Sequence, residues 1–594
     1  MLLEVENLHV HLQSGDETVK AVAGVSFAIA KGETFCLVGE SGSGKSVTAL
    51  SVIQLLPRDI SHHPAGRIAF DYRHDDGRVE RVDMLTASEA RKRAIRGARM
   101  AMIFQEPMTS LNPVFTIGDQ IMEALQIHRP AMAASEARER AILALEQVQI
   151  PKAKERVDDY PHRLSGGQRQ RVMIAMAMAC EPDLLIADEP TTALDVTVQA
   201  EILRLMRDLQ ERKGMSMLFI THDFGVVAQM ARRLAVMRLG KIVESGTVDE
   251  VLRHPRHDYT RQLLAALPEN LKRNSPPSPA GLRQRGEEEE RLIQNEKQNM
   301  GVAGGRRVPA SHADVSAPPF AKGGAGEISS PPPLIDLRDL QVYFPVKKGL
   351  LRRTADYVKA VDGVDLAIPK GQILALVGES GCGKTTLGRA ILRLAEPTGG
   401  QIHYAGRDIT GLSRAQVRPL RRELQIIFQD PMSSLNPRLT IAETLTEPMK
   451  AHGLGASKEE RLERARSLLQ RVQLAPEHLW RYPHEFSGGQ RQRIGIARAL
   501  ALQPRFIVCD EVTSALDVSV QAEVLQLLLS LRDEHQLTLL FITHNIGVVE
   551  YVSDETAVMF GGRIVERGPT AQVCGRPRHP YTQKLLAAVP RLVL

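Results

Sequence analysis

Short apolar runs recur along the chain, and each is followed at once by a distinctive polar group. Two runs lead into glycine-rich loops, two end in an Asp-Glu pair, and two end in Thr-His. Apolar runs of about four to eight residues are typical of strands buried on both faces of a parallel sheet. The pattern therefore predicts an α/β fold in which these polar groups gather at one sheet edge. The runs are residues 34–38, 184–187 and 217–220 in the first half of the chain and residues 373–377, 506–509 and 539–542 in the second.

The second half of the chain repeats the first. Residues 39–46, Gly-Glu-Ser-Gly-Ser-Gly-Lys-Ser, return almost unchanged at 378–385, and Ser-Gly-Gly-Gln-Arg-Gln-Arg at 165–171 returns at 487–493. Self-similarity of this kind indicates a tandem duplication. The first copy carries about fifteen extra residues between its first two motifs, around residues 62–89, and their polar composition predicts an enlarged surface hairpin or loop.

Composition indicates a linker between the two copies. Residues 269–333 hold nine prolines and eight glycines, so we predict two domains, 1–268 and 334–594, joined by a flexible Pro/Gly-rich linker. A flexible chain of that length has a root-mean-square reach of about 45 Å, which lets two adjacent domains dock. An acid run at 287–290 is interpreted as a solvated part of this linker in preference to a binding tail.

The glycine-rich loops predict binding of a nucleoside triphosphate. Strand, G-x-x-x-x-G-K-[ST] loop and helix follow one another in both copies, which is the context that this phosphate-binding motif requires. The glycines let successive backbone N–H groups form an anion nest, and the helix N-terminus adds its positive dipole end. The lysine would reach the β- and γ-phosphates, and the Ser or Thr hydroxyl would ligate Mg²⁺. The predicted residues are Gly39, Ser41, Gly42, Gly44, Lys45 and Ser46 in the first copy and Gly378, Ser380, Gly381, Gly383, Lys384, Thr385 and Thr386 in the second.

Acids and histidines at neighbouring strand ends complete the predicted site. The first acid of each pair is placed to hold Mg²⁺, and the second to polarise the attacking water as general base. The histidine after the third strand is placed to contact the γ-phosphate and that base. A lone histidine is more often structural, but its position beside an acid pair favours the catalytic interpretation. These residues are Asp188, Glu189 and His222 in the first copy and Asp510, Glu511 and His544 in the second.

Together with three further elements, these motifs resemble the ATP-binding-cassette ATPases over both halves of the chain. The further elements are Gln105 and Gln429, the SGGQ motifs with Ser165, Gly167, Ser487 and Gly489, and Ala-Leu-Asp at 193–195 and 515–517. The resemblance implies two P-loop NTPase (RecA-like) cassettes. Each would have an antiparallel β subdomain and a helical subdomain that carries the SGGQ signature.

The same resemblance implies a head-to-tail sandwich in which each ATP lies between the glycine-rich loop of one cassette and the SGGQ motif of the other. It pairs Lys45 with Ser487 and Lys384 with Ser165. It also assigns the two glutamines to contact Mg²⁺ and to link the γ-phosphate to transport. Neither site lacks a catalytic group, so we predict two hydrolytically competent sites.

Stacking of the adenine base is expected to differ between the sites. Family members commonly stack it on an aromatic residue of an early strand. The second cassette offers Phe344 or Tyr357 for this role, whereas the first offers only Leu12. Base stacking is therefore not predicted for the first site.

The two tails resemble a narrower group, the bacterial oligopeptide, dipeptide and nickel importer ATPases. The matching segments are 254–268 and 576–590, the Gln-(Glu/Asp)-Pro-Met stretches at 105–108 and 429–432, and residues 349–351. This resemblance implies an importer ATPase for glutathione or di- and oligopeptides at the cytoplasmic face of the bacterial inner membrane. The implied partners are two integral-membrane permease subunits and, indirectly, a periplasmic binding protein, and the solute itself is not expected to touch this chain.

Charge and composition argue against several other classes. A formal charge of +6 over 594 residues is not the dense basic surface of a nucleic-acid binder. No stretch approaches the roughly 18 to 20 apolar residues of a membrane span, and the acid-bearing N-terminus is unlike a signal peptide. Five widely spaced cysteines without C-x-x-C argue against zinc, iron–sulfur and disulfide frameworks. The tail residues His254, His257 and His579 are interpreted as packing residues in preference to metal ligands.

The sequence disfavours two alternative functions. A soluble double-cassette ATPase that acts on ribosomes or nucleic acid would be expected to have a helical, strongly basic linker. An ATPase of an exporter usually carries its membrane spans in the same chain. The Pro/Gly-rich linker with its acid run and the absence of apolar spans fit neither class.

Overall fold

Each half of the chain builds a parallel sheet, an antiparallel sheet and a helical subdomain. The computed structural model describes residues 1–15, 17–74, 76–105, 110–192, 194–274, 333–348, 353–430, 434–514 and 516–590. The acid run at 287–290 and the segment 349–351 lie outside the described residues. So do parts of the Gln-Pro-Met motifs (106–108, 431 and 432) and of the Ala-Leu-Asp motifs (193 and 515). Most of the predicted linker does too, but its first residues belong to a helix, α12 (Pro268–Asn274).

The central sheet of the first cassette has the order β11-β10-β3-β9-β8-β7, in which β3, β7, β8, β9 and β10 run parallel and β11 pairs antiparallel at the edge. The predicted apolar runs are its buried strands. Its strands are β3 (Thr34–Val38), β7 (Met100–Ile103), β8 (Leu184–Asp188), β9 (Ser216–Thr221), β10 (Arg233–Arg238) and β11 (Lys241–Thr247).

The second cassette repeats this sheet in the order β17-β18-β19-β14-β20-β21. Its strands are β14 (Ile373–Val377), β17 (Leu424–Ile427), β18 (Phe506–Asp510), β19 (Thr538–Ile542), β20 (Glu555–Phe560) and β21 (Arg563–Pro569). Because the strands are parallel, the glycine-rich loop, the Asp-Glu pair and the Thr-His pair all follow strand ends at one sheet edge in both cassettes. This is the edge that the sequence pattern predicts.

An antiparallel sheet covers one side of each cassette. In the first it contains β1 (Leu3–Ser14), β2 (Glu17–Ile29), β4 (Ser61–His62), β5 (Arg67–Arg73) and β6 (Val79–Asp83), and in the second β12 (Ile335–Lys348), β13 (Arg353–Ile368), β15 (Gly399–Tyr404) and β16 (Arg407–Asp408). The hairpin β5-β6 is longer than β15-β16, and β4 adds a short strand against β1. The enlarged hairpin predicted for the extra residues is therefore confirmed.

In sequence, each helical subdomain lies between the strand that precedes the Gln (β7 or β17) and the strand that leads into the Asp-Glu pair (β8 or β18). Five of their ten described helices begin at a Ser or Thr whose side chain caps the first turn, as at Thr116 of α4 and Ser457 of α18. The helices are α4 (Ile117–His128), α5 (Ala134–Gln147), α6 (Ala153–Arg156), η1 (Pro161–Arg163) and α7 (Gly166–Met178) in the first cassette and α17 (Ile441–Ala451), α18 (Lys458–Arg471), η3 (Pro476–Trp480), η4 (Pro483–Glu485) and α19 (Gly488–Leu500) in the second.

The remaining helices pack against the sheets or form the tails. In the first cassette they are α1 (Lys45–Ile53), α2 (Glu89–Ile95), α8 (Val196–Lys213), α9 (Phe224–Met230), α10 (Val248–Arg253), α11 (Asp258–Ala265) and α12, and in the second α14 (Lys384–Ile391), α15 (Arg414–Val417), η2 (Leu420–Arg422), α20 (Val518–His535), α21 (Ile546–Val552), α22 (Thr570–Gly575) and α23 (Pro580–Ala587). No helix in the described ranges combines the length and apolarity needed to cross a membrane.

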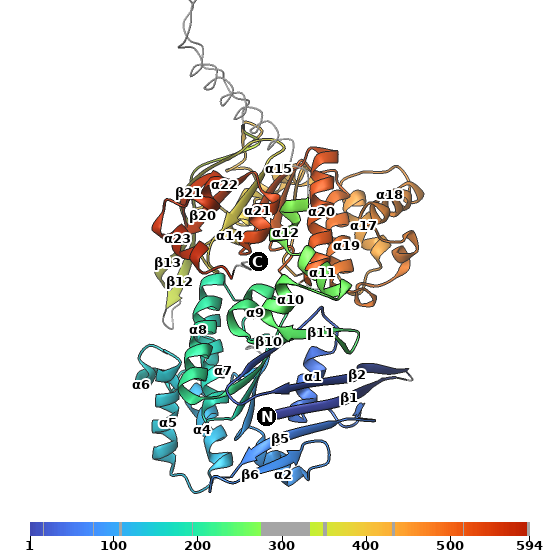
Figure 1. The fold of residues 1–594 in the computed structure, drawn as a ribbon. Helices are drawn as coiled ribbons and strands as arrows, with labels where there is room; N and C mark the ends of the chain where they lie inside the picture. Colours follow the sequence, from blue (N-terminus) through green and yellow to red (C-terminus); the bar gives the residue numbers. More distant parts are fainter. Residues whose placement is uncertain are drawn as a thin grey trace, which may run out of the picture.

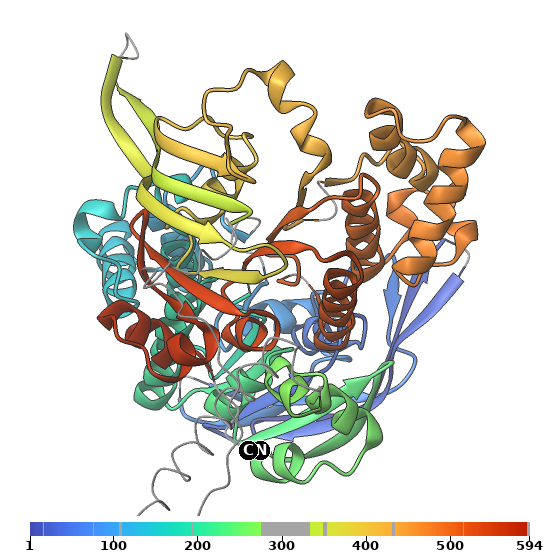
Figure 2. The same ribbon diagram turned by 90° about the horizontal axis from the view of Figure 1, so that it is seen from above.

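The two cassettes lie against each other in opposite directions. Figures 1 and 2 show the helices α17 and α18 of the second cassette on the same side as β1 and β2 of the first, and α4 to α6 of the first on the same side as β12 and β13 of the second. Helix α12 of the first tail contacts α21 of the second cassette. The arrangement is head-to-tail, as the family resemblance implies.

Candidate nucleotide site

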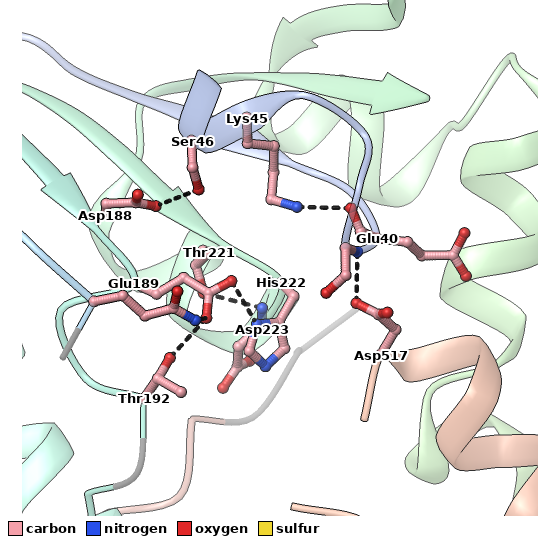
Figure 3. A network of polar contacts seen from close by, with 12 residues as sticks. Glu40, Lys45, Ser46, Asp188, Glu189, Thr192, Thr221, His222, Asp223 and Asp517 are labelled. Atoms are coloured by element: carbon pink, nitrogen blue, oxygen red, sulfur yellow. Dashed lines mark hydrogen bonds and ion pairs between the residues drawn. The ribbon is translucent and has the colours of Figure 1, made fainter. Parts of the chain in front are cut away.

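The first glycine-rich loop closes around the ammonium of Lys45. Its Nζ donates to the carbonyl oxygen of Glu40 at 2.8 Å (Figure 3). It also donates to the carbonyl oxygen of Gly39 at 2.7 Å and to Ser43 Oγ at 3.3 Å. Burial lowers the pKa of Lys45, although the nearby carboxylates oppose this effect. Lys384 repeats the two carbonyl contacts at 2.8 and 2.9 Å. Both loops are therefore formed as the motif predicts, with the lysine at their centre.

The first glycine of each loop cannot be replaced without a clash. Gly39 and Gly378 have φ of +150° and +153°, and a Cβ atom there would come within 2.3 and 2.2 Å of the carbonyl oxygens of Met237 and Met559. The loops therefore run directly against the backbone of β10 and β20. This close approach leaves no room for a side chain at the first position of the loop.

The first acid of each pair meets the hydroxyl that ends the loop. Ser46 Oγ donates to Asp188 Oδ1 at 3.1 Å, and Thr385 Oγ1 donates to Asp510 Oδ1 at 2.9 Å. Burial raises the pKa of Asp188 to about 6, with a further contribution from the charge of Glu189. Burial also raises the pKa of Asp510. Each pair thus places a hydroxyl oxygen beside a desolvated carboxyl group.

The second acid is the centre of a polar cluster in the first cassette. Glu189 accepts hydrogen bonds from Gln105 Nε2 at 3.0 Å and Thr192 Oγ1 at 2.9 Å, and His222 Nδ1 lies 3.2 Å from its Oε1 (Figure 3). Burial alone would raise the pKa of Glu189, but its contact with His222 lowers it overall, and the same contact raises the pKa of His222 against the effect of burial. The carboxylate is therefore held ionised beside a histidine that favours its charged form.

The second cassette builds the same cluster with one difference. Glu511 accepts from Gln429 Nε2 at 2.7 Å, and His544 Nδ1 lies 3.6 Å from its Oε1. Ser514, which replaces Thr192 by sequence position, donates to the backbone oxygen of Glu511 instead of its carboxylate. Burial opposes the effect of His544, but the pKa of Glu511 is lowered overall.

Both glutamates have backbone conformations that L-residues rarely adopt. Their φ angles are +46° at Glu189 and +47° at Glu511. A non-glycine residue in the left-handed region costs on the order of 1–2 kcal/mol, and such residues concentrate at functional sites. The same angle in both copies, like that of Glu181 and Gln503, is a feature of the shared fold that fixes the direction of the glutamate backbone.

A cavity of about 480 Å³ is lined by nine residues predicted for the second site, whereas Gly378 and Asp510 do not line it. Thr192 and Leu194 of the first cassette also line it, so the site is built from both halves of the chain. The predicted residues that line this cavity are Ser380, Gly381, Gly383, Lys384, Thr385, Thr386, Gln429, Glu511 and His544.

Two reciprocal hydrogen bonds join the cassettes at their glycine-rich loops. Ser41 N donates to Asp517 Oδ1 at 2.7 Å (Figure 3), and Ser380 N donates to Asp195 Oδ1. Both aspartates are N-cap residues, of α20 and α8, yet neither caps its own helix with its side chain. Because the carboxylates are turned across the interface, they belong to the site of the opposite cassette.

Neither aspartate is among the residues that the sequence predicts for the site. They lie in the Ala-Leu-Asp motif, so the repeated motif was the available signal, but an Asp before a helix is ordinarily interpreted as a cap. Only the docked structure shows that each carboxylate accepts a hydrogen bond from a backbone N–H group of the opposite cassette.

The SGGQ serines lie where the motif predicts, at the start of a helix. Ser165 caps α7 and Ser487 caps α19, each in a reciprocal capping box with the Gln of the motif. A Cβ atom at Gly167 or Gly489 would come within 2.6 or 2.3 Å of a valine methyl group on α8 or α20. Among the hydrogen bonds of the described residues, none joins either serine to the opposite glycine-rich loop, so the predicted pairing with Lys45 and Lys384 stays a prediction.

The structure also shows where the adenine-stacking candidates, the tail histidines and the cysteines lie. Phe344 and Tyr357 are 47% and 55% exposed on neighbouring strands, whereas Leu12 packs against the core of its antiparallel sheet. His257 and His579 cap the tail helices α11 and α23. The five cysteines are free and buried, and the described part of the chain contains no cluster of three or more metal-ligating side chains.

Comparison with known proteins gives matches over nearly the whole chain. The family model "ABC transporter" matches residues 22–192 and 361–514, and "Oligopeptide/dipeptide transporter, C-terminal region" matches 243–293 and 565–593. The peptidoglycan transport ATP-binding protein YejF of Agrobacterium fabrum is 48% identical, with 99% of this chain and 96% of that protein covered. The glutathione import ATP-binding protein GsiA of Escherichia coli K12 is 47% identical, with 99% and 89% covered.

A solved structure of a dimeric ATP-binding cassette bound to ADP and phosphate is 27% identical, with 41% of this chain and 98% of that chain covered and a TM-score of 0.36. The full-length relatives do not favour the alternative of a soluble ATPase that acts on ribosomes or nucleic acid. The predicted fold class and family resemblance are confirmed. The chain belongs to the ABC transporter family, as an ATP-hydrolysing protein with two cassettes.

Proposed function

We propose that the protein is the energy-coupling subunit of a bacterial importer for glutathione or short peptides. The observation that carries this proposal is the full-length similarity to ATP-binding proteins named for glutathione import and peptidoglycan transport, tails included. The domains would be the cassettes 1–268 and 334–594, with 269–333 as the linker, whose first residues belong to α12.

In this proposal, one ATP binds at each glycine-rich loop. Lys45 and Lys384 would bind the β- and γ-phosphates, and Glu189 and Glu511 would act as general bases, each oriented by its histidine. Ser487 and Ser165 would complete the sites from the opposite cassette, since a helix N-terminus favours a phosphate. The reciprocal aspartate contacts support such composite sites.

Mg²⁺ fits the oxygen ligands beside each loop. The hydroxyl and carboxylate of Ser46 and Asp188, or of Thr385 and Asp510, are the hard ligands that this ion prefers, and Gln105 and Gln429 lie at the same strand edge. When bound, the ion would neutralise charge on the β- and γ-phosphates. The elevated pKa of Asp188 supports this assignment, because a cation would stabilise the charged form that burial disfavours.

Transport would follow from the different affinities of two cassette arrangements for nucleotide. Bound ATP favours the closed arrangement, and hydrolysis with product release favours the open one. Gln105 and Gln429 contact the catalytic glutamates. A shift of the segments after these glutamines would therefore change the position of the glutamates relative to the γ-phosphate. Two integral-membrane permease subunits at the inner membrane would receive this motion, and a periplasmic protein would deliver the solute.

Co-purification tests this proposal against the ribosomal alternative. The tagged full-length protein, isolated from its native host in mild detergent, should bring down two multi-span membrane proteins. Co-sedimentation with ribosomes in their absence would refute the importer assignment. Binding of glutathione and a peptide panel to the associated periplasmic protein would identify the solute class.

A further inference from the structure

Each tail places a tyrosine against the glycine-rich loop of its own cassette. Tyr259 Oη donates to Glu40 Oε2 at 2.8 Å, and Tyr581 Oη accepts from the backbone N–H of Glu379 at 3.0 Å. Glu40 and Glu379 are the second residues of the two phosphate-binding motifs. The tails therefore contact the nucleotide site directly, although the proposed function gives them no role there.

A chain of hydrogen bonds fixes the position of Tyr259. The Glu244 carboxylate on β11 accepts from the backbone N–H groups of Arg256 at 2.7 Å and His257 at 3.1 Å. His257 Nδ1 then accepts from Tyr259 N at 3.1 Å. The Arg238 guanidinium lies 4.6 Å from the centre of the tyrosine ring, a cation–π contact. Tyr259 is only 4% exposed, so its phenol has a fixed direction.

The phenol of Tyr259 is a hydrogen-bond donor toward a carboxylate. Burial raises its pKa well above the usual range, and the hydrogen bond to Glu40 adds to the shift, so the proton stays on the oxygen. Figure 3 shows the Glu40 carboxylate directed away from Lys45, while the backbone oxygen of the same residue accepts from Lys45 Nζ. The phenol is thus placed to keep a negative charge out of the phosphate cradle.

Loss of this hydrogen bond would leave a carboxylate free beside the bound lysine. A Glu40 side chain turned toward Lys45 would compete for the ammonium and would repel phosphate oxygens, both of which weaken nucleotide binding. The second cassette lacks this arrangement, because Tyr581 contacts a backbone N–H and Phe560, 4.3 Å from its ring centre, takes the place of Arg238.

We propose that Tyr259 is a positioning residue of the first nucleotide site, which holds the Glu40 carboxylate away from the triphosphate. Tyr581 supports its loop through the backbone and does not restrain the Glu379 carboxylate. Tyr259 also contacts the backbone of Glu40, so the two tails differ in the additional restraint that Tyr259 places on the Glu40 carboxylate. This inference rests on the proposed assignment of residues 39–46 to ATP.

The test measures binding of a fluorescent ATP analogue to the full chain in a Lys384→Ala background, in which only the first site binds. Tyr259→Phe should weaken binding about ten- to 100-fold, as expected for the loss of one hydrogen bond to a charged group. The double variant Tyr259→Phe with Glu40→Gln should bind within twofold of Glu40→Gln alone, because the neutral amide no longer repels phosphate.

Three outcomes are decisive. Unchanged binding in Tyr259→Phe, or weakened binding that Glu40→Gln does not rescue, would overturn the inference, because a packing defect does not depend on the charge of Glu40. The matched pair Tyr581→Phe and Glu379→Gln, in a Lys45→Ala background, should show no rescue, and rescue there would overturn the predicted difference between the tails. Retained binding when Lys45→Ala is combined with Lys384→Ala would instead refute the proposed ATP assignment.

Discussion

Replacing Asp517 by alanine removes one of the two carboxylates that join the cassettes. In the structure, this carboxylate accepts a 2.7 Å hydrogen bond from the backbone N–H of Ser41. Hydrogen bonds to charged groups contribute about 1.5–3 kcal/mol. Ser41 is exposed and Asp517 is half-buried, so the lower end applies, about 1.5 kcal/mol. A loss of that size corresponds to about a tenfold shift from joined toward separated cassettes.

Spin labels measure this shift directly. Cysteines introduced at Ile127 in the first helical subdomain and at Trp480 in the second, which are 64% and 60% exposed, report the distance between the subdomains. The five native cysteines are buried, so the introduced ones should react selectively. With ATP and Mg²⁺, pulsed electron paramagnetic resonance should show a smaller closed fraction in Asp517→Ala than in the parent protein.

The matched control for this experiment is Asp249→Ala. That carboxylate is 71% exposed and pairs with Arg253 within α10, so its removal changes the net charge equally without touching the cassette interface. Asp249→Ala should leave the distance distribution unchanged. An equal closed fraction in Asp517→Ala and the parent would refute the role assigned to the contact between Asp517 and Ser41.

Three further predictions concern catalysis, the metal and the core. Glu189→Gln and Glu511→Gln should each lower turnover about 100-fold at the altered site in an ATPase assay, and an unchanged total rate in either variant would mean that its site does not hydrolyse ATP. Asp188→Asn should raise the Mg²⁺ concentration needed for half-maximal ATPase activity, because one anionic oxygen ligand is lost, and an unchanged Mg²⁺ titration would exclude this carboxylate as a ligand. Phe219→Ala should destabilise the first cassette by about 3–5 kcal/mol, since Phe219 is fully buried, and calorimetry that shows no lower unfolding temperature would contradict its place in the core.

Much of the fold could be predicted because the same apolar runs and motifs occur in both halves of the sequence. The apolar runs became buried parallel strands, and the charges that follow them met at one edge, since parallel strands carry their ends to the same side. The contacts within each cassette, such as Ser46 with Asp188, follow from motif order alone. The enlarged hairpin was also visible as extra polar residues in one copy.

Contacts between the halves could not be predicted in the same way. Asp195 and Asp517 look like helix caps in sequence, and only the docked cassettes turn their carboxylates onto Ser380 and Ser41. Tyr259 belongs to a tail motif whose backbone is held by Glu244. Both residues are far in sequence from Glu40, the loop residue that Tyr259 contacts. Such partners are set by tertiary packing, which leaves no periodic signal in the sequence.

Differences between equivalent side-chain contacts of the two copies could not be predicted either. Thr192 donates to the Glu189 carboxylate, whereas Ser514 donates to a backbone oxygen, and Arg238 and Phe560 give the two tail tyrosines different neighbours. The exchange of Thr192 for Ser514 is conservative, and the exchange of Arg238 for Phe560 is at an exposed position. Their consequences depend on side-chain direction.

Uptake by reconstituted vesicles tests the central claim most directly. Proteoliposomes that contain the full chain with its permease subunits, ATP and Mg²⁺ inside and the loaded binding protein outside, should accumulate labelled glutathione or a short peptide. The doubly substituted Glu189→Gln and Glu511→Gln chain should assemble with the permease but accumulate nothing. Equal uptake with the substituted chain would contradict the account, because transport would then not depend on ATP hydrolysis by these two sites.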